Sequence, residues 1–222
     1  MLKYEIITNQ NDENYGHIRA LINFGTVKKG EVGGRIDNYN NLSQENNCWV
    51  YVNAQVRGDA QVLGNAEVWG NAEVFDNAKV SDKAIVYGNA KVYDDAEVHG
   101  NAKVHGNAKV FDNARVSGDA KVYDDAKVYG NAKVFGKAWV SDNAKVYGNA
   151  QVYGDSEVYD NAQVSGDSEV YDEAYVVGEA KVYGEAKVYG EAFVYGNAKV
   201  CGDTWLSGTD EVWRCWSVNI RR

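Results

Sequence analysis

The sequence contains no proline, a single methionine and only three cysteines among its 222 residues. Cys48, Cys201 and Cys215 form neither the closely spaced pairs of a zinc site nor the even-numbered framework of a disulfide-rich secreted domain. We therefore expect no metal, no cofactor and no disulfide. A reduced, cytoplasmic protein is the default interpretation.

Long apolar runs are also missing. No stretch approaches eighteen consecutive apolar residues, so the sequence predicts no membrane-spanning segment. Residues 1–8 lack the long apolar core of a secretory signal peptide. The net charge of −9 argues against general binding to nucleic acids or other polyanions.

What the sequence has in place of these features is a six-residue repeat. Every sixth residue from Val50 to Val200 is valine, and every sixth residue from position 54 to 198 is alanine except Ser156 and Ser168. Each unit reads Ala-x-Val-y, then glycine or aspartate in most units, then a polar residue, and no insertion interrupts it. A period of six fits neither an α-helix nor a heptad coiled coil, so the pattern indicates a stacked repeat protein.

Side-chain alternation explains the unit. Residues two apart in an extended segment share a face, so alanine and valine point inward while x and y point outward. The Gly/Asp–Asn pair that follows supplies the left-handed backbone angles of a corner. We expect a four-residue strand and a two-residue corner in each hexad. Such a unit buries its inner face only when successive coils stack in parallel register.

The predicted fold is all-β: a parallel β-helix, or β-solenoid, with triangular coils of three hexapeptides and 18 residues per coil. Hexads of this kind resemble the left-handed class, although spacing alone does not determine the handedness. We expect an N-terminal β cap over residues 1–47, with strands at 4–8 and 17–24, and the repeat solenoid over 48–206. A C-terminal cap is expected over residues 207–222, with apolar anchors at Val212, Trp213, Trp216, Val218 and Ile220.

The N-terminal part also carries a resemblance to a known family. The residues concerned are Ile18-Arg19-Ala20-Leu21, Val27-Lys28-Lys29-Gly30-Glu31-Val32-Gly33-Gly34, Asn41-Leu42-Ser43-Gln44 and Cys48-Trp49-Val50-Tyr51. With the hexads that follow, to about residue 206, this pattern resembles the YdcK-type β-solenoid proteins. Arg35 departs from it, because an aromatic residue is expected after the two glycines. The resemblance implies the fold and a prophage or bacterial setting, and it supplies no catalytic residues.

Sorting the outward residues by an 18-residue period gives three faces. The first, called the aromatic face, collects Trp49, Tyr51, Trp69, Ile85, Tyr87, Tyr123, Trp139, Tyr159, Tyr175, Val177, Phe193 and Tyr195. Large exposed apolar patches usually mark interfaces. We therefore expect a homo-oligomer packed on this face, or a protein partner bound there. The alternative is that aromatic residues merely suit strands.

The second face, called the lysine face, has a column of lysines beside a column of aromatic residues. The lysines are Lys91, Lys109, Lys127, Lys145, Lys181 and Lys199, and the aromatic residues are Phe75, Tyr93, Phe111, Tyr129, Tyr147 and Tyr183. Such a surface could bind a nucleic-acid strand or an acidic polymer. The negative net charge favours the other interpretation, in which the lysines pair with acidic corners and cover the tyrosine rings.

The third face is mixed, with a late tyrosine column of Tyr153, Tyr171 and Tyr189. The corners carry acidic columns, Asp76, Asp94, Asp112 and Asp124, Asp142, Asp160. Stacked carboxylates could bind a cation, but aspartates in corners more often accept hydrogen bonds from turn backbone. We therefore expect no metal there.

The histidines do not combine into a site. His99 and His105 occupy equivalent outward positions on adjacent faces and diverge, and His17 lies in the expected cap. We therefore favour a non-catalytic structural or binding scaffold. The alternatives are a hexapeptide-type acyltransferase with an inter-subunit site near His105, and an acidic rod that mimics or engages nucleic acid.

Overall fold

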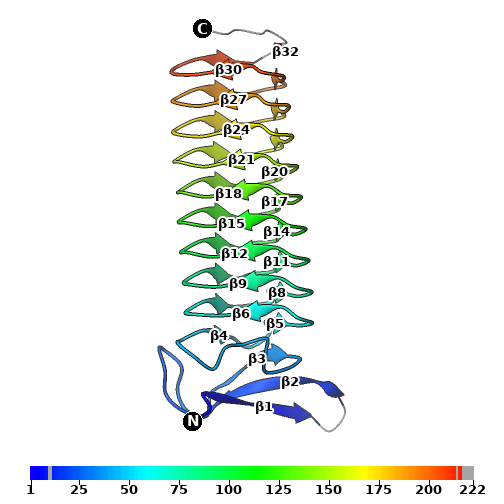
Figure 1. Ribbon diagram of the computed structural model, residues 1–222, viewed down its shortest axis with the longest axis vertical. Helices are drawn as coiled ribbons and strands as arrows, with labels where there is room; N and C mark the ends of the chain where they lie inside the picture. The colour runs from blue at the N-terminus through cyan, green and yellow to red at the C-terminus, as the bar shows by residue number, and fades with distance from the viewer. Residues whose placement is uncertain (10–11, 214, 217–222) are drawn as a thin grey trace.

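The hexads wind into a β-solenoid whose coils stack along one axis, as Figure 1 shows. The computed structural model describes residues 1–9, 12–213 and 215–216. Within each sheet of the rod, a strand pairs in parallel with the strand of the next coil. Lys109 is opposite Lys127, and Val110 is opposite Val128. This register of 18 residues confirms three hexads per coil; the left-handed winding stays a prediction.

Three sheets run along the rod, one for each side of the triangular coil. Among the described residues, the aromatic face contains β4 (Trp49–Val50), β7 (Glu67–Val68), β10 (Ile85–Val86), β13 (Lys103–Val104), β16 (Lys121–Val122), β19 (Trp139–Val140), β22 (Glu157–Val158), β25 (Tyr175–Val176), β28 (Phe193–Val194) and β31 (Glu211–Val212). The third face contains β6 (Gln61–Val62), β9 (Lys79–Val80), β12 (Glu97–Val98), β15 (Arg115–Val116), β18 (Lys133–Val134), β21 (Gln151–Val152), β24 (Glu169–Val170), β27 (Lys187–Val188) and β30 (Trp205–Leu206).

The lysine face belongs to a sheet that continues into the N-terminal segment. Its strands are β1 (Tyr4–Asn9), β2 (Asp12–Ala20), β3 (Val32–Ile36), β5 (Gln55–Val56), β8 (Glu73–Val74), β11 (Lys91–Val92), β14 (Lys109–Val110), β17 (Lys127–Val128), β20 (Lys145–Val146), β23 (Gln163–Val164), β26 (Lys181–Val182), β29 (Lys199–Val200) and β32 (Cys215–Trp216). No helix in the described part of the chain is long and apolar enough to cross a membrane.

The interior of the rod is dry and uniform. The repeated valines and alanines from positions 50 to 200 are almost completely buried, as expected from alternation. The two serines that replace alanine are equally buried, and each satisfies its hydroxyl locally. Ser156 Oγ donates to Tyr153 O at 2.8 Å, and Ser168 Oγ donates to Ser165 O at 2.8 Å. These bonds remove the cost of burying an unpaired hydroxyl.

The strands are shorter than the four residues expected, because only x and Val have regular strand geometry. The ladder nevertheless covers the flanking positions: Gln55 N donates to Ala72 O and Arg57 N donates to Val74 O. The backbone then turns at once, and Ala60 N donates back to Arg57 O at 3.3 Å. Each side of the triangle is therefore a short strand between two tight turns.

The first corner residue has a positive φ, which explains the choice of glycine or aspartate. At Gly100, φ is +72°, and an added Cβ would lie 2.9 Å from Gly118 N, so glycine avoids both strain and a clash. Aspartate tolerates the same backbone at Asp112, where φ is +56°. Its carboxylate compensates by accepting a hydrogen bond from Gly130 N of the next coil at 3.0 Å.

The ladder begins earlier in the chain than the hexad pattern. β3 pairs with β5, which places Ile36 opposite Val56, and Leu42 forms an isolated parallel bridge with Val62. These partners are 20 residues apart, because eight residues rather than six separate Leu42 from Val50. A two-residue insertion therefore hides a first coil inside the segment expected to be only a cap.

A β-hairpin of β1 and β2 covers this first coil, and β2 pairs antiparallel with β3. The second strand begins earlier and ends sooner than the predicted 17–24, at Asp12 and Ala20. The hairpin is fastened by the buried Lys3, whose Nζ donates to Cys48 O at 3.1 Å and to Glu45 O at 3.3 Å.

At the C-terminal end the solenoid continues past residue 206. β31 extends the aromatic face and buries Val212, whereas Trp213 is exposed. β32 pairs with β29, with Cys215 opposite Lys199, so two residues fewer than a full coil separate them. The anchors expected at Val218 and Ile220 lie outside the described residues.

We predict that Val134→Asp destabilises the rod by more than about 3 kcal/mol, because an unpaired carboxylate would enter the dry interior. Lys133→Asp is the matched control: Lys133 is exposed, and the change should alter stability by about 0.5 kcal/mol at most. Urea unfolding followed by circular dichroism measures both. Equal midpoints for the two variants would contradict the buried position of Val134.

Candidate interaction faces

The structure brings the predicted aromatic residues together on one side of the rod, the sheet from β4 to β31. Trp69 and Trp139 are the most exposed of them, at 41% and 38%. The tyrosines, Ile85 and Phe193 are half-buried. Val177 is only 9% exposed, so it contributes little surface.

Trp49 is the exception, and its place on an exposed face is a wrong prediction. The side chain is completely buried. Phe24 and Tyr4 pack edge-on against its ring, with centroids 5.4 and 6.2 Å away. Trp49 therefore joins the N-terminal segment to the first coils and is not available to a partner.

Rings on the aromatic face stack in the middle of the rod. Tyr87, His105 and Tyr123 form a continuous stack, with centroids 4.5 and 5.0 Å apart. Beyond it, Trp139 turns edge-on to Tyr123, and Lys121 Nζ lies 4.1 Å from the Trp139 centroid. Such a cation–π contact holds the indole against the sheet.

A shallow apolar hollow lies toward the N-terminal end of the same face. It is lined by Trp69, Ile85, Tyr87 and Lys103. Because Lys103 contributes a flexible side chain and the other three are large and apolar, the hollow could receive an apolar side chain from a partner.

The histidines are placed as predicted. His105 lies on the aromatic face, and His99 lies on the third face, where its Nδ1 is 3.9 Å from Asp82 Oδ2. His17 contacts Gly33 O through Nδ1 at 3.0 Å. Burial between two tyrosine rings lowers the pKa of His105, and the nearby Lys103 adds to this effect, although Asp124 opposes it.

The lysine face has the two predicted columns. Phe75, Tyr93, Phe111, Tyr129 and Tyr147 form one unbroken stack, with centroids 4.9 to 5.0 Å apart and planes within 5°. Each inner ring therefore has a neighbour against both of its faces. This geometry leaves mainly ring edges and hydroxyl groups toward solvent.

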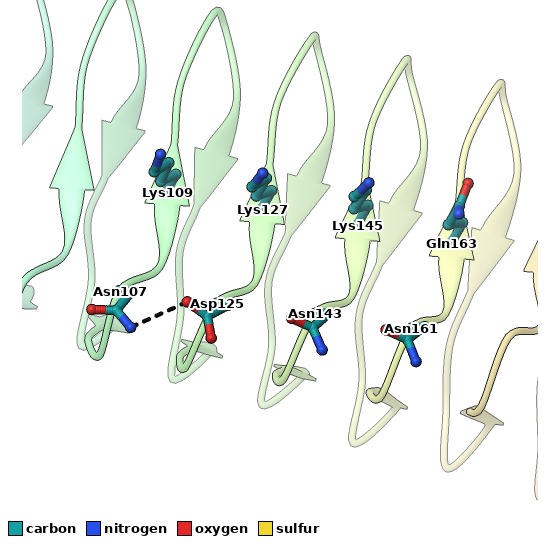
Figure 2. Close-up of a pocket in the computed structure, with 8 residues that line it drawn as sticks. All are labelled: Asn107, Lys109, Asp125, Lys127, Asn143, Lys145, Asn161 and Gln163. Atoms are coloured by element: carbon teal, nitrogen blue, oxygen red, sulfur yellow. Dashed lines mark hydrogen bonds between the residues drawn. The ribbon is translucent and has the colours of Figure 1, made fainter.

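The lysine column differs from the interpretation in which lysines pair with acidic corners. Lys91 does pair with an acid, since its Nζ lies 2.8 Å from Glu73 Oε1. Lys109, Lys127 and Lys145 have no ion pair within the described residues. They line a groove together with an amide row, shown in Figure 2.

The third face carries its own ring stack, longer than predicted by one residue. Phe135 precedes Tyr153, Tyr171 and Tyr189, with centroids 4.7 to 5.1 Å apart. Tyr153 Oη donates to Glu169 Oε2 at 3.0 Å. Burial, with the Glu169 carboxylate beside it, raises the pKa of Tyr153.

The acidic corners are used by the backbone. Asp112 N donates to Asp94 Oδ2 at 3.2 Å, and Gly178 N donates to Asp160 Oδ2 at 3.3 Å. Across the residues that the structure describes, no group of three or more His, Cys, Asp or Glu side chains is arranged to hold a metal ion. The corner aspartates thus stabilise the turn of the following coil.

Comparison with protein-family models and with curated proteins finds no match for this chain. The resemblance to the YdcK-type proteins therefore stays a prediction. The coarser statement, that the chain is a β-solenoid with coils of three hexads, rests on the register of the strands.

We predict that the His105 imidazole titrates below the ordinary value of about 6.5, because its stack with Tyr87 and Tyr123 disfavours the charged form. The free energy of unfolding should then fall as pH drops from about 6.5 through the lower pKa of the folded state, since the unfolded chain binds the proton more readily.

Nuclear magnetic resonance titration of the ring protons, assigned with His105→Phe, measures this pKa. His105→Phe keeps an aromatic ring in the stack and should lack that component of the pH dependence. A titration midpoint above the ordinary histidine value would contradict the prediction.

Proposed function

We propose that the chain is a non-catalytic scaffold that pairs with a second copy of itself through the aromatic face. The observation that carries the proposal is the pair of partly exposed tryptophans, Trp69 and Trp139, on a flat sheet that also holds an apolar hollow. Interface cores are enriched in aromatic residues of this kind, and tryptophan is prominent among energetic hot spots.

The size of the face supports a stable pair. Ten strands of this sheet are described, and coils repeat at about 4.8 Å, so the face is about 45 Å long and about 13 Å wide. Two copies in contact would bury on the order of 1,200 Å², at the lower end of the range for specific interfaces.

Charge on the face favours an antiparallel pair. Lys121 lies one coil before Trp139, and Glu157 lies one coil after it. A two-fold axis near Trp139 exchanges these rows, so each Lys121 would approach Glu157 of the other copy. Isologous contacts around such an axis are the commonest in homo-oligomers.

Neither alternative from the sequence has a specific observation in its favour. The acyltransferase hypothesis centred on His105, whose two ring faces are covered by Tyr87 and Tyr123. The nucleic-acid mimic requires a continuously acidic surface, whereas one face presents stacked, unpaired lysines. Calorimetric binding of acetyl-coenzyme A that is lost in His105→Ala would revive the acyltransferase hypothesis.

We predict that the purified protein sediments as a dimer and that Trp139→Glu shifts it to a monomer, because a charge would enter the apolar contact. Trp205→Glu is a matched control. Trp205 is 53% exposed, has Lys187 Nζ 5.8 Å from its ring, and lies on the third face.

The control variant should remain dimeric, and circular dichroism should show the same fold for all three proteins. A monomeric wild-type protein, or a dimer that persists in Trp139→Glu, would overturn the proposed interface.

A further inference from the structure

A polar groove runs along the lysine face between two rows of side chains. One wall is Lys109, Lys127, Lys145 and Gln163, and the other is Asn107, Asp125, Asn143 and Asn161. Figure 2 shows the two rows side by side across four successive coils. The groove has a volume of about 670 Å³, enough for a short polymer segment and too open for a buried cofactor.

The lysine wall is an uncompensated line of positive charge. Lys109, Lys127 and Lys145 are directly opposite one another in successive coils. Like charges in that position are destabilising. Elsewhere the ladders neutralise such charges, as where Lys187 Nζ meets Glu169 Oε1 at 3.0 Å. Bound anions would relieve the repulsion in this groove.

The opposite wall offers hydrogen bonds in both directions. Asn107 Nδ2 donates to Asp125 Oδ1 at 3.1 Å. The side-chain amides of Asn143, Asn161 and Gln163 have no hydrogen bond within the described residues. Each amide can donate and accept, which suits hydroxyl groups, and Asp125 can accept from a hydroxyl but would repel an anion.

Two kinds of linear polyanion fit this geometry poorly. Single-stranded nucleic acid binds by stacking its bases on open aromatic faces. Here the rings beside the lysines are stacked on each other, with Phe111 and Tyr129 4.9 Å apart and 1° from parallel. An extended acidic peptide repeats its side chains on one face at about 6.7 Å, out of step with lysines at about 4.8 Å.

We propose that this groove binds an acidic polysaccharide, a chain of sugar rings that carries carboxylates and hydroxyls. The carboxylates would pair with Lys109, Lys127 and Lys145, while the hydroxyls would meet the amide row. A pyranose unit advances by about the length of one coil, so the four coils of the groove match a segment of a few sugars. The net negative charge of the chain does not oppose this, because local charge decides contacts within about one Debye length, about 8–10 Å.

The test is calorimetric titration with oligogalacturonates of increasing length at low ionic strength. Binding should strengthen with length and level off once the oligomer spans the groove. The fully methyl-esterified oligomer has the same backbone without charge and should bind at least about tenfold more weakly. The triple variant Lys109→Gln, Lys127→Gln, Lys145→Gln should weaken binding of the acidic oligomer to a similar degree.

The matched control replaces three exposed lysines on the other faces, Lys79→Gln, Lys103→Gln and Lys133→Gln, and changes the net charge equally. It should bind within about twofold of the wild-type protein. Asn143→Ala with Asn161→Ala should weaken binding of the sugar but not of poly-glutamate.

Several results would overturn the proposal: no binding of the acidic oligomer, equal loss in both triple variants, or tighter binding of single-stranded DNA or poly-glutamate. The groove and the aromatic face lie on different sides of the rod. Trp139→Glu should therefore keep sugar binding, and loss of dimerisation alone would leave this inference standing.

Discussion

The hydrogen bonds along the rod axis hold each outward side chain against its counterpart in the next coil. Lys127 N donates to Ala144 O at 2.9 Å and Tyr129 N donates to Val146 O at 3.0 Å, and this pattern recurs through the rod. The ladder persists because alanine and valine fill the interior without a gap or an unpaired polar group. A change of one residue in coil length would move every column on the surface.

This constraint makes the surface a set of columns rather than a set of loops. A residue type repeated every 18 positions becomes a continuous line of one chemistry, whether rings, amides or ammonium groups. Sites on such a rod are therefore long, flat and periodic, and suit a second flat surface or an extended polymer. Both proposed contacts have this character, and each uses a different side of the triangle.

The N-terminal end shows how the repeat is closed. The β1–β2 hairpin lies antiparallel to β3, so an open parallel edge is not left at that end. The buried ammonium of Lys3 accepts a cost in desolvation, which lowers its pKa, and recovers it through carbonyl partners such as Cys48 O. Trp49 packs beneath the hairpin, so the cap and the first coils form one apolar cluster.

Periodicity alone determined the coil of three hexads, the inward positions and the membership of the columns, because alternation and a fixed repeat are local properties of the chain. Tertiary structure decided what each column residue contacts. Trp49 is buried because Tyr4 and Phe24, distant in sequence, pack on it. Ile36 joins the ladder through an insertion that the repeat conceals, and Lys127 lacks an acid because the side-chain arrangement of neighbouring coils leaves none within reach. Contacts of these kinds depend on packing between distant segments and on rotamers, and a sequence period carries neither.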